Sequence, residues 1–160
     1  MREELLALIE RNSRLDSKEL AILLGVEEED VVKELAALEE EGIICGYHTL
    51  VNWEKTSNEK VTALIEVRVT PQRGQGFDNI AERIYKYPEV RSVYLISGGY
   101  DLMVILEGKS IREISTFVSD KLSTLDSVLS TATHFILKKY KDHGTVLSRK
   151  KEDEREMITP

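Results

Sequence analysis

The apolar residues of the first fifty positions recur at helical spacing in three short runs. Within each run the residues fall at i, i+3 and i+4, or at i, i+4 and i+7, which is one face of a helix. The runs are Leu5, Leu8 and Ile9; Leu20, Leu23 and Leu24; and Val31, Leu35 and Leu38. The pattern therefore predicts three short helices.

Polar residues and glycines mark where these helices begin and end. Asp16, with Glu19 three residues later, is typical of a capping box at the start of the second helix. Gly25 ends that helix, and Gly42 ends the third. The apolar, β-branched stretch over residues 43–51 favours one or two short strands. Three helices and a small ribbon predict a winged helix-turn-helix.

From residue 61 onward, strand and helix patterns alternate. Apolar residues occupy every second position of residues 61–69, as in a half-buried strand. The later segments are a helix over 77–85, strands over 90–97 and 100–107, a helix over 111–122 and a strand over 128–140. The order βαββαβ is that of a ferredoxin-like domain. Its helices cover one face of the sheet, so we expect a partner subunit on the other face.

These segments place the chain in the α+β class and divide it into four parts. We expect a winged helix-turn-helix at residues 1–52, a hinge at 53–60 and a charged tail at 148–160. The ferredoxin-like part, residues 61–147, is expected to bind an effector and to form oligomers. The hinge is predicted because its residues are polar and lack hydrophobic periodicity.

Composition limits the class of protein, and charge adds an asymmetry. Hydrophobic residues make up 41% of the chain and charged residues 32%, which is typical of a globular protein. No apolar run approaches the roughly 18 residues of a membrane span. The single cysteine, Cys45, favours a reducing cytoplasm. Residues 1–50 hold 5 lysines and arginines against 13 acids, a net charge of −8, whereas the rest hold 17 against 16. The first third therefore repels phosphate.

Three motifs, in this order and spacing, resemble the Lrp/AsnC family of transcriptional regulators. The first is Glu-Leu-Ala at residues 19–21, followed by Gly-Val at 25–26 and by Val31, which fits the helix-turn-helix. The second is residues 38–44, at the exit of the recognition helix. The third is Gly-Tyr-Asp-Leu at residues 99–102, before the third strand of the effector domain.

The resemblance covers residues 1–147 and implies a function. Members of this family are DNA-binding homodimers that often assemble into octamers. Their effectors are commonly amino acids, bound where effector domains meet. We therefore expect a cytoplasmic transcriptional regulator that binds double-stranded DNA and responds to an amino acid or a related small molecule.

The predicted recognition helix departs from the family pattern. Its first turn is acidic over residues 27–30, and Lys33 is its only remaining basic residue. Acids in a first turn complement the helix dipole, so this turn is consistent with a solvated cap. Alternatively, the helix has lost sequence readout, or makes protein contacts through Val32, Ala36 and Ala37. The chain would then be a ligand-sensing oligomeric interaction module that no longer reads DNA.

Four basic residues are candidates for DNA binding: Arg11, Arg14, Lys18 and Lys33. Arg14 and Lys18 flank the start of the second helix, whose free N–H groups favour an anion. Each residue alone is equally consistent with a solvated surface cation. As a set in a dimer, they would neutralise roughly 2–4 phosphates.

Candidate effector residues lie at the junction of the two middle strands and on the last strand. They are Gly98, Gly99, Tyr100, Asp101, Thr131 and Thr133. The glycine pair predicts a two-residue hairpin turn in which positive φ angles bring backbone amides close to a ligand. The aspartate would suit the ammonium group of an amino acid, and the threonines would add hydroxyls. The alternatives are a plain hairpin turn and β-branched residues on a pleated surface.

No residue pattern predicts a metal, a cofactor or catalysis. The three histidines, His48, His134 and His143, lie far apart and lack ligand spacing. Cys45 follows two isoleucines, and we expect it to be a small buried hydrophobe. The sequence contains no phosphate-binding glycine loop, nucleophile elbow or paired-carboxylate signature. We therefore do not expect an enzyme.

Overall fold

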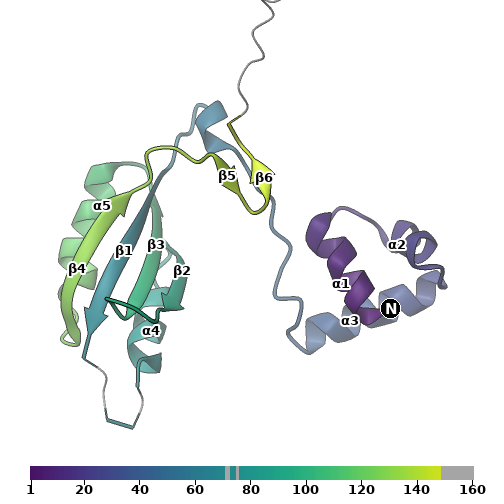
Figure 1. Cartoon of the computed structure of the whole chain (residues 1–160), viewed down its shortest axis with the longest axis horizontal. Coiled ribbons are helices and arrows are strands. Elements are labelled where there is room, and N and C mark those ends of the chain that lie inside the picture. The colour runs from purple at the N-terminus through teal and green to yellow at the C-terminus, as the bar shows by residue number, and fades with distance from the viewer. Residues whose placement is uncertain (71–72, 75, 149–160) are drawn as a thin grey trace, which may run out of the picture. The chain divides into compact units, whose positions relative to one another are not determined.

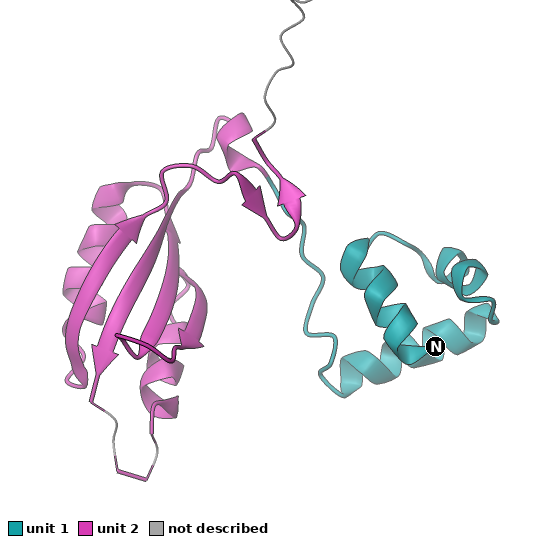
Figure 2. Ribbon diagram, viewed as in Figure 1, with its two compact units in different colours: residues 1–51 teal, residues 52–160 magenta. Residues whose placement is uncertain are grey.

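The computed structural model describes residues 1–70, 73–74 and 76–148 of the chain. The chain divides into two compact units, Met1–Val51 and Asn52–Pro160 (Figure 2). Apart from Ser148, the predicted charged tail lies outside the described residues.

The first unit contains three helices (Figure 1): α1 (Arg2–Arg11), α2 (Ser17–Leu24) and α3 (Glu28–Glu40). The apolar faces predicted from the sequence meet in one small core. Its buried members are Leu5, Ile9, Leu20, Ala21, Val31 and Leu38. Because α2 and α3 each contribute to this core, the core fixes the angle between the two helices of the helix-turn-helix.

Both ends of α2 have the caps that the sequence predicts. The Asp16 side chain accepts a hydrogen bond from the Glu19 backbone N–H (2.8 Å), and the Glu19 side chain accepts one from the Asp16 N–H (3.0 Å). At the other end, Gly25 has φ 67°, and its N–H and that of Val26 both donate to the Ala21 carbonyl. The left-handed backbone conformation at this position costs the least free energy when the residue is glycine, and it turns the chain sharply into α3.

The strands expected after α3 are not formed. Residues 43–52 contain no strand or bridge, so the wing is absent from the described unit. The physical reason is that an extended segment becomes a strand only when another segment accepts and donates its backbone hydrogen bonds. Within the segment predicted as a hinge, Trp53–Lys55 forms a short 3-10 helix, η1. The Lys60 ammonium group lies 4.1 Å from the centre of the Trp53 ring.

The second unit is an antiparallel sheet with helices on one face, as the pattern predicts (Figure 1). Its sheet order is β2-β3-β1-β4. The elements are β1 (Val61–Val69), α4 (Asp78–Tyr85), β2 (Val90–Leu95), β3 (Leu102–Gly108), α5 (Ile111–Phe117), the π-helical turn η2 (Val118–Leu122) and β4 (Val128–Phe135). This is the βαββαβ arrangement of a ferredoxin-like fold.

The two faces of this sheet differ in what covers them. Ala63, Ile65 and Val67 of β1 are completely buried against the α4–α5 side, together with residues of β3 and both helices. The opposite face, here called the open face, has no helix over it within the described residues. Its apolar members are partly buried or exposed side chains of all four strands: Leu64, Tyr94, Met103, Ile105 and Ala132.

Two predicted elements have different bounds. The connection between β2 and β3 is not a two-residue turn but six residues, 96–101, closed by a hydrogen bond from the Ile96 N–H to the Asp101 carbonyl (2.8 Å). The last strand ends at Phe135 rather than at Tyr140: its pairing with β1 stops at the Ala63–Phe135 pair, and the sheet offers β4 no second neighbour.

A small hairpin that the sequence pattern did not predict follows β4. It consists of β5 (Lys141–Asp142) and β6 (Thr145–Val146). His143 and Gly144, between these strands, both have positive φ, 43° and 76°. Two consecutive positive φ values are the geometry of a tight hairpin turn, in which glycine is favoured. The His-Gly dipeptide was therefore the signal for this turn.

Candidate nucleic-acid interface and effector loop

The α2–turn–α3 unit presents one side of α3 to solvent. Val31 and Leu38 are completely buried and attach the helix to the rest of the unit. On the opposite side Val32, Lys33 and Ala36 are exposed. In a helix-turn-helix, the second helix enters the major groove with its exposed side toward the bases. The geometry of this unit is therefore that of a DNA-reading head.

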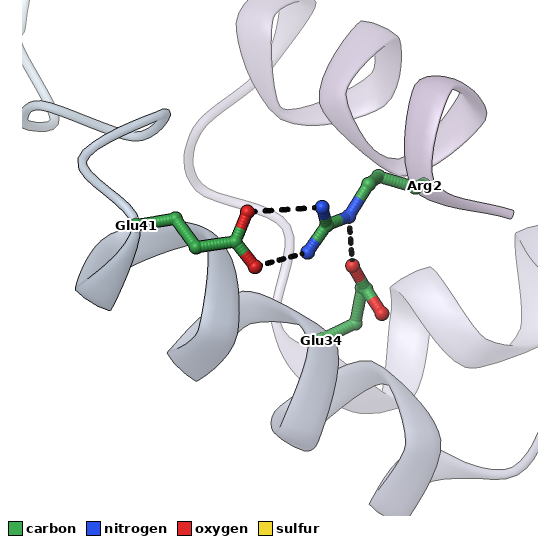
Figure 3. Close-up of polar contacts among 3 residues, drawn as sticks. All are labelled: Arg2, Glu34 and Glu41. Atoms are coloured by element: carbon green, nitrogen blue, oxygen red, sulfur yellow. Dashed lines mark hydrogen bonds and ion pairs between the residues drawn. The ribbon is translucent and has the colours of Figure 1, made fainter.

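An arginine clamp that the sequence analysis missed holds α3 in place (Figure 3). Arg2, at the start of α1, donates two hydrogen bonds to the Glu41 carboxylate (3.0 and 2.8 Å) and one from Nε to Glu34. These bonds raise the pKa of Arg2, and the Arg2 hydrogen bond lowers the pKa of the Glu41 carboxyl. The sequence signal was weak, because nothing in it places residue 2 beside residues 34 and 41.

The acidic first turn of α3 is partly engaged by the protein. The Ser17 hydroxyl donates to Glu28 (2.6 Å), and Lys33 lies 3.8 Å from Glu29, one turn apart on the helix. Exposed pairs of this kind contribute little to stability. They do fix where the charges lie, since Glu28 is held toward α2 and Glu29 partly neutralises Lys33.

The four candidate phosphate-binding residues are all exposed. Arg11 ends α1, Arg14 lies in the turn before α2, and Lys18 lies in the first turn of α2. Within the described parts of the chain, none of these three has a carboxylate at ion-pair distance. Lys33 differs, because it pairs with Glu29 and comes from the exposed side of α3. Three of the four thus retain a free positive charge.

Cys45 is exposed, contrary to the expectation of a buried hydrophobe. After Gly42 the chain leaves the core, and the Cys45 thiol donates to the Gly42 carbonyl (3.1 Å). The thiol lines a groove of about 540 Å³ between α1 and residues 43–48. Beside it, the Tyr47 hydroxyl donates to Glu39 (2.8 Å), and partial burial together with this bond raises the pKa of Tyr47.

In the second unit, Asp101 closes the 96–101 loop onto the end of β1. Its carboxylate accepts a hydrogen bond from the Val69 N–H (2.9 Å), and its own N–H donates to the Val67 carbonyl (3.0 Å). One carboxylate oxygen, Oδ2, is thus occupied by the backbone. The other carboxylate oxygen, Oδ1, has no hydrogen-bond partner among the described residues.

The glycines of this loop do not have the conformation that the sequence analysis expected. Neither Gly98 nor Gly99 has a φ in the left-handed region, because six residues, rather than two, share the reversal of the chain. Both glycines are exposed, and Tyr100 is half-buried. A side chain at position 99 would meet no atom within 4 Å. The structure therefore shows an open loop rather than a tight hairpin.

The two threonines do not join this loop in one cluster. Thr131 pairs with Val67 and Thr133 with Ile65, so both lie on the face that α4 and α5 cover. The Thr131 hydroxyl lies 3.3 Å from that of Ser123. Strand β1 separates Thr131 from Asp101, which places their backbones about 10 Å apart across the sheet.

A polar contact on the open face was also missed. His134 Nε2 lies 3.4 Å from a Glu66 carboxylate oxygen, and both side chains belong to the open face of β4 and β1. Alternation within each strand places both residues on this face, but it does not reveal the diagonal contact between them.

Comparison with known proteins identifies the family. The Lrp/AsnC ligand binding domain matches residues 62–146, more than half of the chain. The chain belongs to the Lrp/AsnC family. It is 49% identical to the HTH-type transcriptional regulator YugG of Bacillus subtilis, over 98% of this chain and 95% of that protein. It is 30% identical to the regulator LrpA of Pyrococcus abyssi, over 86% and 94% of the two chains.

A solved Lrp/AsnC-like structure has the same fold. A transcriptional regulator of Neisseria meningitidis, crystallised as a complex with L-methionine, matches with a TM-score of 0.71 and 25% identity over 88% of this chain and 90% of that one. This Lrp/AsnC chain is thus a transcriptional regulator of helix-turn-helix type, which the comparisons support over an interaction module that does not read DNA. The relatives reported are regulators of transcription rather than enzymes.

The described residues form neither a metal-binding cluster nor a membrane-spanning helix. No three histidine, cysteine, aspartate or glutamate side chains among them are grouped so as to hold a metal ion. None of the helices formed by these residues has the length and apolar character needed to cross a membrane.

Proposed function

We propose that this Lrp/AsnC regulator binds double-stranded DNA through its first unit and an amino acid or related small molecule through its second. The observation that carries the proposal is the arrangement of α2 and α3. The caps of α2, the buried core and the Arg2 clamp fix the position of α3 so that one side of this helix faces solvent. We place the protein in the cytoplasm, and we propose that it acts as a binding protein without catalytic activity.

The phosphate contacts come from few residues. Arg11, Arg14 and Lys18 supply free cations before and within the first turn of α2, whose N-terminus is itself capped by the Asp16 carboxylate. Lys33 would add a contact from α3. The acidic turn over residues 27–30 opposes them, so DNA binding is weakened relative to that of a basic head and depends on sequence readout.

The effector site includes the 96–101 loop. Residues Gly98 to Tyr100 present backbone groups to solvent, and Asp101 offers its second carboxylate oxygen to an ammonium group. The L-methionine complex of the Neisseria regulator supports an amino acid as the chemical class. Thr131 and Thr133 remain candidates, as a second set of hydroxyls reached from the helix-covered side.

We also propose that the regulator assembles as a homodimer or as a larger ring such as an octamer. Its open face carries the apolar side chains that a second copy would cover. In a dimer, ligand binding between effector units changes the spacing of two DNA-reading heads, which couples the two sites.

The test is a fluorescence-anisotropy titration with DNA from upstream of the protein's own gene and with a scrambled duplex. We expect saturable, sequence-preferring binding with a shallow salt dependence, a slope of about −2 to −4 in log K against log salt. The triple variant Arg14→Ala, Lys18→Ala, Lys33→Ala should bind more weakly and have a smaller slope. Lys86→Ala, in the second unit, is the matched control. A lack of preference at low salt with amino acids supplied would overturn the proposal.

A further inference from the structure

The exposed side of α3 is apolar at two positions where a DNA-reading helix usually presents polar groups. Val32 is 51% exposed, and Ala36 is exposed one turn further along the helix. Neither side chain contributes to the core, whose α3 members are Val31 and Leu38. Single exposed apolar side chains are common on protein surfaces. These two differ because they lie one turn apart on the side of α3 that a helix-turn-helix presents to the bases.

Several polar side chains of α3 are engaged within the protein, whereas Asp30 and Glu40 are exposed. Glu34 accepts a bond from Arg2, Glu28 accepts one from Ser17, and Glu39 accepts one from Tyr47. Glu29 is paired with Lys33. The exposed side of α3 therefore offers two apolar contacts, Val32 and Ala36, beside the Lys33–Glu29 pair.

The major groove contains one apolar group that distinguishes base pairs. This is the C5-methyl group of thymine, whereas the other groups on the base edges are hydrogen-bond donors and acceptors. Valine and alanine side chains cannot form hydrogen bonds, but they can contact a methyl group. Residues 32 and 36 are about 6 Å apart along the helix axis, which corresponds to about two base-pair steps.

We propose that Val32 and Ala36 read thymine methyl groups about two base pairs apart in each half-site. The inference rests on the proposed DNA binding and adds its specificity. Methyl contacts would also add a favourable contribution to DNA binding that does not depend on positive charge. If Val32 and Ala36 instead contact an apolar surface of another protein, removal of these methyl groups would not change the affinity for DNA.

The experiment removes the methyl groups and leaves the protein unchanged. A duplex that the full-length protein selects from a random pool is synthesised with deoxyuridine in place of one thymine at a time. We expect two positions per half-site, about two base pairs apart, at which the loss of one methyl weakens binding about fourfold. Substitution of flanking thymines should have no effect, which controls for a general change in DNA shape.

Protein variants then assign the contact to α3. In the double variant Val32→Ser, Ala36→Ser, the ratio of thymine to deoxyuridine affinity should fall to about one. The matched control is Ile22→Ser, because Ile22 is 73% exposed but lies on α2. If the double variant fails to fold, the duplex comparison with unaltered protein still decides. Equal binding of both duplexes would overturn this inference alone, whereas a lack of binding to any duplex would overturn the proposed function as well.

Discussion

At the scale of single residues, Arg2 and Asp101 each link two segments of one unit by hydrogen bonds. Arg2 joins the start of α1 to the end of α3 through two carboxylates. Asp101 joins the β2–β3 loop to the last residues of β1. Each is a polar residue that connects distant parts of one unit, and we therefore expect its substitution to change the stability of that unit.

The Arg2–Glu41 pair predicts an acid-dependent stability. Because Arg2 lowers the pKa of Glu41 below its ordinary value near 4.5, the pair stabilises the fold above that pH and loses the effect as pH falls through the lowered pKa. Glu41→Gln should therefore lower the midpoint of thermal unfolding by a few °C at pH 7 and have no effect near pH 2.

The measurement is thermal unfolding followed by circular dichroism between pH 2 and pH 7. Glu40→Gln, an exposed neighbour, is the control and should shift the midpoint little at any pH. A Glu41→Gln effect of equal size across the whole range would show that the ion pair is not responsible.

Asp101 predicts a separation of structural and ligand-binding roles. Asp101→Ala removes the acceptor for the Val69 N–H, which should cost about 1–2 kcal/mol of stability and also abolish the amino-acid response. Asp101→Asn keeps an acceptor oxygen but loses the charge. It should remain near wild-type stability and still lose the response. The measurement is the shift in the midpoint of thermal unfolding when each of the twenty amino acids is added. If Asp101→Asn shows the same shift as the unaltered protein, Asp101 is not part of the ligand site.

At the scale of elements, local patterns predicted most of the fold. The Asp16–Glu19 capping box and Gly25 determine where α2 begins and ends, because the signals lie within a few residues of each other. The alternation in residues 61–69 predicted β1 for the same reason. The predicted two-residue turn between β2 and β3 was wrong, and the connection has six residues. The Gly98-Gly99 dipeptide is a local signal, and it carries no information about the hydrogen bonds by which Asp101 holds the loop to β1.

The site was harder to predict than the elements. Charge and position along the chain identified Arg11, Arg14 and Lys18 as exposed cations, but the Arg2–Glu34–Glu41 contacts depend on how three helices pack. Thr131 and Thr133 share one face of β4, but the strand register places that face under the helices and away from Asp101. Register and packing depend on distant partners, which spacing in the sequence does not specify.

At the scale of the whole molecule, the open face predicts self-association. Ile105 pairs with Leu64 and Ser92 in the middle of this face, so a charge there would be buried by a second copy. Ile105→Glu should weaken the dimer about 100-fold or more, because an unpaired carboxylate would lose its hydration. Sedimentation equilibrium measures the change. Ile111→Glu, on the exposed side of α5, is the control; equal effects of the two variants would argue against an interface on the open face.

The central position of β1 has a consequence for the order in which the protein folds. The first unit is built from three successive helices with local contacts, which form quickly and early during synthesis. Strand β1 is different, because its second neighbour, β4, follows about sixty to seventy residues later. During translation β1 therefore has one edge unpaired until the ribosome has released residue 135, and this interval is when the nascent chain most needs protection from aggregation.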